Sequence, residues 1–158
     1  MTEKIFRNLK IYTDGGCHVH QSEKPGAFAL VVYNGKDKIL EYVSDFEINT
    51  TNNIQELKAV IQAYKLIRQG SWRMCTIYTD SQYIQKGLTE WITAWRKNKW
   101  KTSTGKDVQN LELWQELYNL SKTGGKVNLE WVKGHDGEEG NEICDELCTT
   151  SINEYYKT

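Results

Sequence analysis

The sequence contains little proline and no long hydrophobic run, and both absences limit the kind of protein it encodes. A single proline among 158 residues leaves no proline-rich spacer between domains. The longest apolar stretches, such as residues 27–33, are far too short to cross a bilayer as a helix. Residues 1–10 are polar and lack the apolar segment of a secretory signal. We therefore expect residues 1–158 to form a single domain of a cytoplasmic protein.

Cysteine and net charge are also low. The four cysteines could pair, but without a sign of export we expect reduced thiols. The net charge of -1 does not by itself indicate a nucleic-acid-binding protein. The charges are unevenly distributed, however, because residues 91–106 include five basic residues and no acidic one, whereas residues 136–146 include six acidic residues and no Lys or Arg. The first segment is suited to a polyanion and the second to cations.

The hydrophobic pattern predicts an alternation of strands and helices. Short apolar segments predict five strands, at residues 9–14, 26–33, 39–46, 74–79 and 126–132. Asn34 and Gly35 predict a hairpin between the second and third. Helices are expected over residues 52–67 with Asn52 or Asn53 as N-cap, after Asp80, around residues 91–95, over residues 111–120 and from about Asn141. Three consecutive strands followed by crossovers predict an α/β fold with a five-stranded mixed sheet, three antiparallel strands then parallel crossovers, and helices on both faces.

The tetrapeptide Ile-Tyr-Thr-Asp occurs twice, at residues 11–14 and 77–80, each time at the end of a predicted strand. If the two strands are parallel neighbours, Asp14 and Asp80 point the same way from backbones ~4.8 Å apart. Such carboxylates repel each other, and a divalent cation between them removes the repulsion. The carboxyl ends of strands are also where open α/β sheets place their ligands. The repeat therefore favours a metal site at this edge.

Two further acids fall near the starts of helices, Glu56 in the first long helix and Asp145 in the last. Four carboxylates without a Cys/His framework suit Mg²⁺ or Mn²⁺. Two such ions ~3.5–4 Å apart can activate a water and stabilise the leaving oxygen of a phosphodiester. Taken singly, each acid also has a structural explanation, since Asp before Gly is common in turns and acids are favoured at helix starts.

Four segments of the sequence resemble motifs of the ribonucleases H of the bacterial type I class. They are Asp14-Gly15-Gly16-Cys17; Thr50-Thr51-Asn52-Asn53 with Glu56-Leu57; Thr79-Asp80-Ser81-Gln82-Tyr83; and Trp131-Val132-Lys133-Gly134-His135 with Gly137, Asn141-Glu142 and Asp145-Glu146-Leu147. All four appear in family order between residues 9 and 147. The resemblance implies a ribonuclease H-like fold and endonucleolytic hydrolysis of the RNA strand of RNA–DNA hybrids by two Mg²⁺ ions, with Mn²⁺ as a possible substitute, giving 5′-phosphate and 3′-hydroxyl ends.

The resemblance also implies roles for individual residues. The catalytic residues would be Asp14, Glu56, Asp80, His135 and Asp145, of which the four carboxylates hold the metal. Glu142 would have a secondary place near the scissile phosphate. The contacts to the hybrid would come from Tyr83, Trp91 and Trp95 along the DNA sugars, from the basic residues Lys97, Lys99 and Lys101, from Thr51 and Asn110 at a DNA phosphate, and from Cys17, Asn52, Asn53 and Gln82 in the minor groove. The structural alternative for the tryptophans is a buried stripe on an amphipathic helix.

The sequence departs from the family pattern in three places and leaves other functions open. Residues 18–24 replace a short turn, and Ile54 stands where an Arg is common, so minor-groove and phosphate contacts are expected to differ. The loop after His135 is unusually acidic, with Asp136, Glu138 and Glu139, and is expected to alter metal affinity or histidine mobility. Cys17, His18 and His20 form no complete zinc pattern, and Cys144 and Cys148 are expected to pack as small apolar groups. A non-catalytic hybrid-binding module and an integrase-like strand-transfer enzyme are the alternative functions. The expected partner is the hybrid duplex, bound by a monomer without a membrane or an obligatory protein partner.

Overall fold

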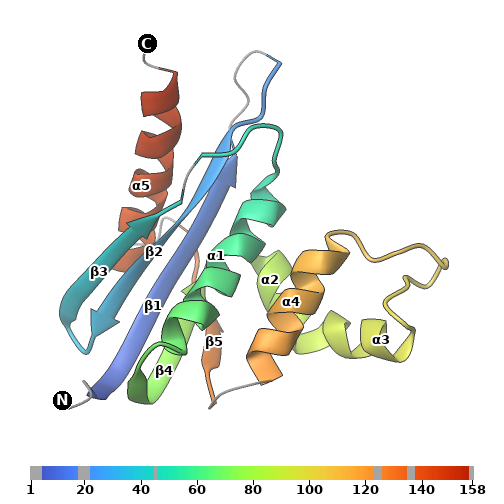
Figure 1. The fold of residues 1–158 in the computed structure, drawn as a ribbon, viewed down its shortest axis with the longest axis horizontal. Helices are drawn as coiled ribbons and strands as arrows, with labels where there is room; N and C mark the ends of the chain where they lie inside the picture. Colours follow the sequence, from blue (N-terminus) through green and yellow to red (C-terminus); the bar gives the residue numbers. More distant parts are fainter. Residues whose placement is uncertain (1–4, 18–21, 45, 123–125, 135–137, 157–158) are drawn as a thin grey trace.

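The computed structural model describes residues 5–17, 22–44, 46–122, 126–134 and 138–156. Its five strands form one sheet in the order β3-β2-β1-β4-β5 (Figure 1). The strands are β1 (Ile5–Cys17), β2 (Gly26–Asn34), β3 (Asp37–Val43), β4 (Ser71–Thr79) and β5 (Asn128–Trp131). The pairs β1–β2 and β2–β3 are antiparallel, whereas β1–β4 and β4–β5 are parallel. The predicted mixed sheet is therefore confirmed.

Helices cover both faces of this sheet (Figure 1). They are α1 (Asn52–Ile67), α2 (Gln82–Lys86), the π-helical turn η1 (Gly87–Trp91), α3 (Ile92–Lys97), α4 (Leu111–Lys122) and α5 (Glu139–Tyr155). Because side chains alternate along a strand, Leu30 and Val32 of β2 join the core beneath α1, whereas Ala29 and Val31 pack beneath α5. No helix in the described part of the chain is both long enough and apolar enough to span a membrane.

The two Ile-Tyr-Thr-Asp segments lie side by side. Ile11 of β1 is in register with Ile77 of β4, and Tyr12 with Tyr78. Both isoleucines are completely buried on one face, and the two tyrosine rings stack on the other with centroids 4.6 Å apart. Since the strands run parallel, the Asp that ends each segment reaches the same edge of the sheet, as the repeat predicted.

The start of α1 differs from the expectation. The N-cap is Thr51, whose Oγ1 accepts a hydrogen bond of 3.1 Å from the backbone N–H of Ile54. The prediction that Asn52 or Asn53 caps this helix is therefore wrong. Asn52 instead accepts a 2.7 Å hydrogen bond from the backbone N–H of Cys17, which ties the first turn of α1 to the end of β1. The competing interaction is between two segments far apart in the sequence, so local capping rules do not reveal it.

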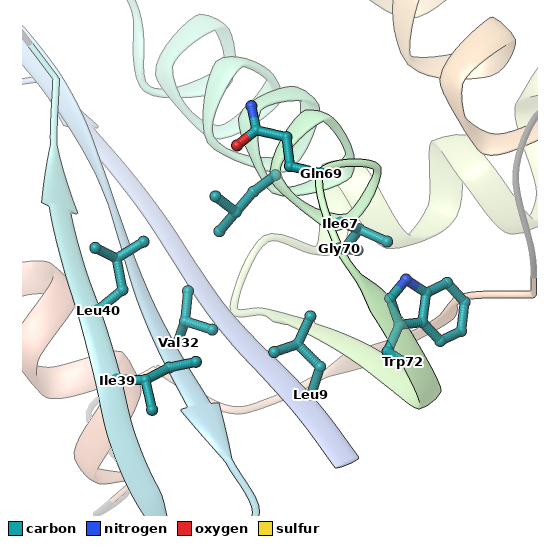
Figure 2. A pocket seen from close by; sticks show the side chains of 9 residues that line it. Leu9, Val32, Ile39, Leu40, Ile67, Gln69, Gly70 and Trp72 are labelled. Carbon is teal, nitrogen blue, oxygen red and sulfur yellow. The ribbon is translucent and has the colours of Figure 1, made fainter. Parts of the chain in front are cut away.

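An apolar pocket lies at the opposite end of β1 from Asp14 (Figure 2). Its lining comes from β1, β2, β3, the end of α1 and β4, and comprises Leu9, Val32, Ile39, Leu40, Leu66, Ile67, Gln69, Gly70 and Trp72. None of these side chains titrates, so the pocket contains no acid, base or nucleophile for catalysis. The chemistry of this chain is to be sought at the other end of the sheet.

Candidate active site

Three carboxylates converge where β1 and β4 end. Asp14 lies on β1, Glu56 on α1 and Asp80 directly after β4, and each offers an oxygen within 4.8 Å of the others. Asp14 and Glu56 are each only 6% exposed, whereas Asp80 is half-buried. The structure thus brings together three of the four acids that the sequence selected.

Gly15 allows the first turn of α1 to approach β1 closely enough for this cluster. Its backbone N–H donates to Asp14 Oδ1 at 3.0 Å and to Glu56 Oε1 at 2.7 Å. A Cβ at this position would lie 2.3 Å from the carbonyl carbon of Gln55. Only glycine fits there without moving the helix, so Gly15 both spaces the two acids and bonds to each of them.

Burial and mutual repulsion make the cluster strongly electronegative. Desolvation raises the pKa of Asp14 to about 7, a shift that the hydrogen bond with Glu56 opposes and the nearby charges of Asp80 and Asp145 reinforce. Desolvation, followed by the charge of Asp14, raises the pKa of Glu56 well above its ordinary value. The ion pairs found among the described residues all involve other carboxylates. Buried acids that have no cationic partner in the part of the chain that the structure describes fit a divalent cation with oxygen ligands.

Asp145 approaches the cluster from α5. Its charge raises the pKa of Asp14, so the two carboxylates are near each other, although Asp145 is not among the three that lie within 4.8 Å. Glu142, one turn earlier, is exposed. The structure therefore places Asp145 at the margin of the cluster and Glu142 on the outer surface.

Asp80 has neighbours that the sequence did not single out. Asn141, in the first turn of α5 and only 3% exposed, points its Nδ2 toward Asp80 Oδ2 at 3.4 Å. The indole Nε1 of Trp131 donates to the backbone carbonyl of Asp80 at 3.0 Å. Asn141 entered the sequence comparison only as part of a motif. Its position four residues before Asp145, on the same face of a helix, was the signal that could have identified it.

An aromatic cluster lies beside the carboxylates, on α2, η1, α3 and α4. The ring of Tyr83 lies 6.0 Å from that of Trp91, which lies 5.8 Å from that of Trp95. Tyr83 Oη accepts hydrogen bonds from Trp114 Nε1 at 2.8 Å and from Asn110 Nδ2 at 3.2 Å. The fully buried Trp114 is the centre of the cluster, and sequence reasoning missed it because its helix was assigned no functional role.

These aromatic residues have features of both sequence-based predictions, the contact surface for DNA sugars and the buried stripe of an amphipathic helix. Tyr83 and Trp95 pack against the main core, yet Tyr83, Trp91 and Trp95 all keep part of their surface exposed. A ring that is half-buried is rigidly held and still able to contact a ligand. The geometry is compatible with the expected wall for DNA sugars.

The basic segment projects beyond this cluster, at the end of α3 and in the following loop. Lys97, Lys99 and Lys101 are all exposed, and Lys101 forms an ion pair with Asp107. Lys99 has a positive φ of 55°. The three ammonium groups are therefore at the surface, where they can contact a polyanion.

The predicted minor-groove residues cluster at the same edge of the sheet as the carboxylates. Cys17 ends β1, and Asn52, Asn53 and Gln82 are exposed residues at the starts of α1 and α2. Thr51, predicted to contact a DNA phosphate, is the exposed N-cap of α1 beside them. His135, predicted as catalytic, lies outside the described residues, as do His18 and His20 of the incomplete zinc pattern. The expected packing of Cys144 and Cys148 is confirmed, since both lie on α5 and are buried in one cluster with Ala29 and Val31 of β2.

Comparison with known proteins gives concordant results. The family model described as RNase H matches residues 7–153. A ribonuclease H of Francisella philomiragia is 44% identical over 149 residues, which cover 93% of this chain and 92% of the relative. The crystal structure of LC9-RNase H1, a type 1 RNase H with the type 2 active-site motif, superposes with a TM-score of 0.74 at 29% identity, covering 94% of this chain and 73% of that one. A foamy viral protease–reverse transcriptase, solved in complex with an RNA/DNA hybrid, shares the fold with a TM-score of 0.74 at 16% identity, over 90% of this chain and 20% of that one.

Proposed function

This chain belongs to the ribonuclease H family and is an endoribonuclease of that family, and we propose that it hydrolyses the RNA strand of RNA–DNA hybrids by a two-metal-ion mechanism. The observation that carries the proposal is the convergence of Asp14, Glu56 and Asp80 within 4.8 Å. The catalytic carboxylates are these three together with Asp145. The products are a 5′-phosphate and a 3′-hydroxyl end.

The four carboxylates would hold the ions, with Asp14 and Glu56 buried and Asp80 and Asp145 on the more open side. When bound, a pair of Mg²⁺ ions activates a water and stabilises the leaving oxygen of the phosphodiester, and Mn²⁺ has the coordination chemistry to substitute. We assign His135 to proton transfer or product release and Glu142 to a secondary role near the scissile phosphate.

The surface beside the cluster would hold the duplex. The DNA strand would be contacted by two groups of side chains. These are the aromatic rings of Tyr83, Trp91 and Trp95 and the ammonium groups of Lys97, Lys99 and Lys101. A DNA phosphate would contact Thr51 and Asn110, and the minor groove would contact Cys17, Asn52, Asn53 and Gln82. A 2′-hydroxyl in that groove distinguishes RNA from DNA. The exposure of Asn52, Asn53 and Gln82 supports the assignment.

Labelled RNA–DNA, RNA–RNA and DNA–DNA duplexes, each incubated with and without Mg²⁺, test the function. We expect cleavage of the RNA strand of the hybrid alone, only with metal, and with 5′-phosphate ends. Binding of the hybrid without cleavage would favour a non-catalytic module, and joining of DNA ends with intact RNA would favour a strand-transfer enzyme. We further propose that residues 1–158 form a single domain of a cytoplasmic, monomeric protein. One cooperative unfolding transition of this chain and a monomer mass in solution are the expected measurements.

A further inference from the structure

We infer that Asn141 is a positioning residue that fixes the orientation of the Asp80 carboxylate for metal binding. The inference rests on the proposed function, which it deepens by assigning a group that touches no metal itself. Its basis is the approach of the buried Asn141 amide to Asp80, with 3.4 Å between Nδ2 and Oδ2.

Asp80 is the carboxylate of the cluster that most needs such a contact. Asp14 and Glu56 are enclosed by protein and share the backbone N–H of Gly15. Asp80 is half-buried, and its charge acts on both of these neighbours. Rotation of an Asp side chain about χ2 is soft, so repulsion would rotate the oxygens of an unrestrained carboxylate away from its charged neighbours. Among the described residues, the side-chain hydrogen bond that restrains it comes from Asn141.

An amide is chemically suited to this task. A lysine or arginine in the same place would restrain Asp80 but would also neutralise the charge that attracts the cation. The neutral amide N–H occupies one acceptor site of Oδ2 and leaves the negative charge intact. Gly134 also lies near this oxygen, because a Cβ on Gly134 would lie 3.0 Å from Asp80 Oδ2. A side chain larger than that of glycine at position 134 would therefore crowd the carboxylate.

The depth at which α5 sits on the sheet determines whether Asn141 reaches Asp80. A Cβ on Gly140 would lie 2.3 Å from the ring of Tyr12, so glycine permits the first turn of α5 to contact β1 directly. One turn later the thiol of Cys144 donates to the backbone carbonyl of Tyr12 at 3.3 Å. These contacts seat the helix firmly, and the amide is consequently placed by packing that does not involve the metal.

The experiment compares wild-type protein with Asn141→Ala by calorimetric titration of MgCl₂ into the full chain without substrate. Loss of an outer hydrogen bond to a metal-binding group weakens metal affinity by about tenfold or more, and we expect a loss of roughly that size here. Asn153→Ala is the matched control, since it makes the same change at an exposed position of α5. It should bind Mg²⁺ as the wild type does.

Two further measurements distinguish positioning from a structural role. The Mg²⁺ concentration that half-activates hybrid cleavage should rise in Asn141→Ala while the rate at saturating Mg²⁺ recovers, and thermal unfolding in EDTA should change little. Gly134→Ala should weaken Mg²⁺ binding in the same direction, because its Cβ would lie 3.0 Å from Asp80 Oδ2. It serves as the test if Asn141→Ala fails to fold.

Each outcome is decisive. Mg²⁺ affinity within about twofold of wild type in a folded Asn141→Ala would overturn the positioning role, as would lower stability in EDTA with unchanged affinity. If only Gly134→Ala folds, normal Mg²⁺ affinity in that variant would overturn it as well. A wild-type protein that binds no Mg²⁺ at all would overturn the proposed metal mechanism and this inference with it, so the two failures are distinguishable.

Discussion

Replacing Asp14 with Asn removes a charge that the fold holds at a cost when no metal is bound. The pKa of Asp14 is raised from 3.8 to about 7, chiefly by burial. Because the folded state binds this proton more tightly than the unfolded chain does, the metal-free protein loses stability as the pH rises between these values. One pKa unit corresponds to 1.36 kcal/mol, so the penalty is about 1 kcal/mol at pH 4.5 and about 4 kcal/mol at pH 8.

Urea unfolding in EDTA at the two pH values measures this penalty. The amide that replaces the carboxylate is uncharged, although it is still a buried polar group, and we therefore expect Asp14→Asn to raise the free energy of unfolding by roughly 2–4 kcal/mol at pH 8 and by much less at pH 4.5. Cleavage of the hybrid should be lost in the same variant. Adding Mg²⁺ at pH 8 should stabilise the wild type but not the variant, so the difference between their free energies of unfolding should become smaller.

The exposed Asp37 of β3 provides the control, since Asp37→Asn should change stability by no more than about 0.5 kcal/mol at either pH. A gain below about 1 kcal/mol for Asp14→Asn at pH 8, or an equal gain at both pH values, would refute the reasoning from burial and repulsion. So would near-normal cleavage by the variant.

Two other sets of substitutions test the basic segment and the close approach of α1 to β1. Neutralising Lys97, Lys99 and Lys101 should raise KM for the hybrid and lower the slope of log KM against log salt by about 2 to 3, since each lost phosphate contact removes about one; an unchanged KM would argue against their role. Gly15→Ala should slow cleavage severely and cost about 1–3 kcal/mol in urea unfolding, because its Cβ overlaps the backbone of α1. Gly16→Ala has open space around the new Cβ and is the matched control, so equal effects at the two glycines would contradict this explanation.

The sheet and the meeting of Asp14 with Asp80 could be predicted from the sequence because side-chain direction along a strand repeats every two residues. Two copies of one tetrapeptide in parallel strands must present their last side chains alike, and the observed pairing of Ile11 with Ile77 satisfies that condition. The helix start was harder to predict. Thr51, Asn52 and Asn53 are all residue types that are favoured as N-caps. Asn52 is not the cap because its side chain accepts a hydrogen bond from the backbone N–H of Cys17 on β1, and Thr51 caps the helix.

The residues that sequence reasoning missed owe their importance to packing between distant elements. Trp114 is central because η1 brings Gly87 against it, where a Cβ would lie 2.0 Å from the indole. Asn141 reaches Asp80 only because α5 lies so close to β1. No spacing rule contains these distances, since each depends on how two elements approach each other.

The distance between Asp14 and Asp80 is set by the backbone hydrogen bonds that pair β1 with β4 in parallel register. Loops around the site can therefore be lengthened, shortened or recharged without altering the distance on which the ions depend. A single-residue insertion within either strand would have the opposite effect, turning Asp14 or Asp80 toward the other face while leaving most of the sheet intact. Diversity in substrate contacts is thus free to accumulate at the periphery, and the central ladder is the part that tolerates no change in length.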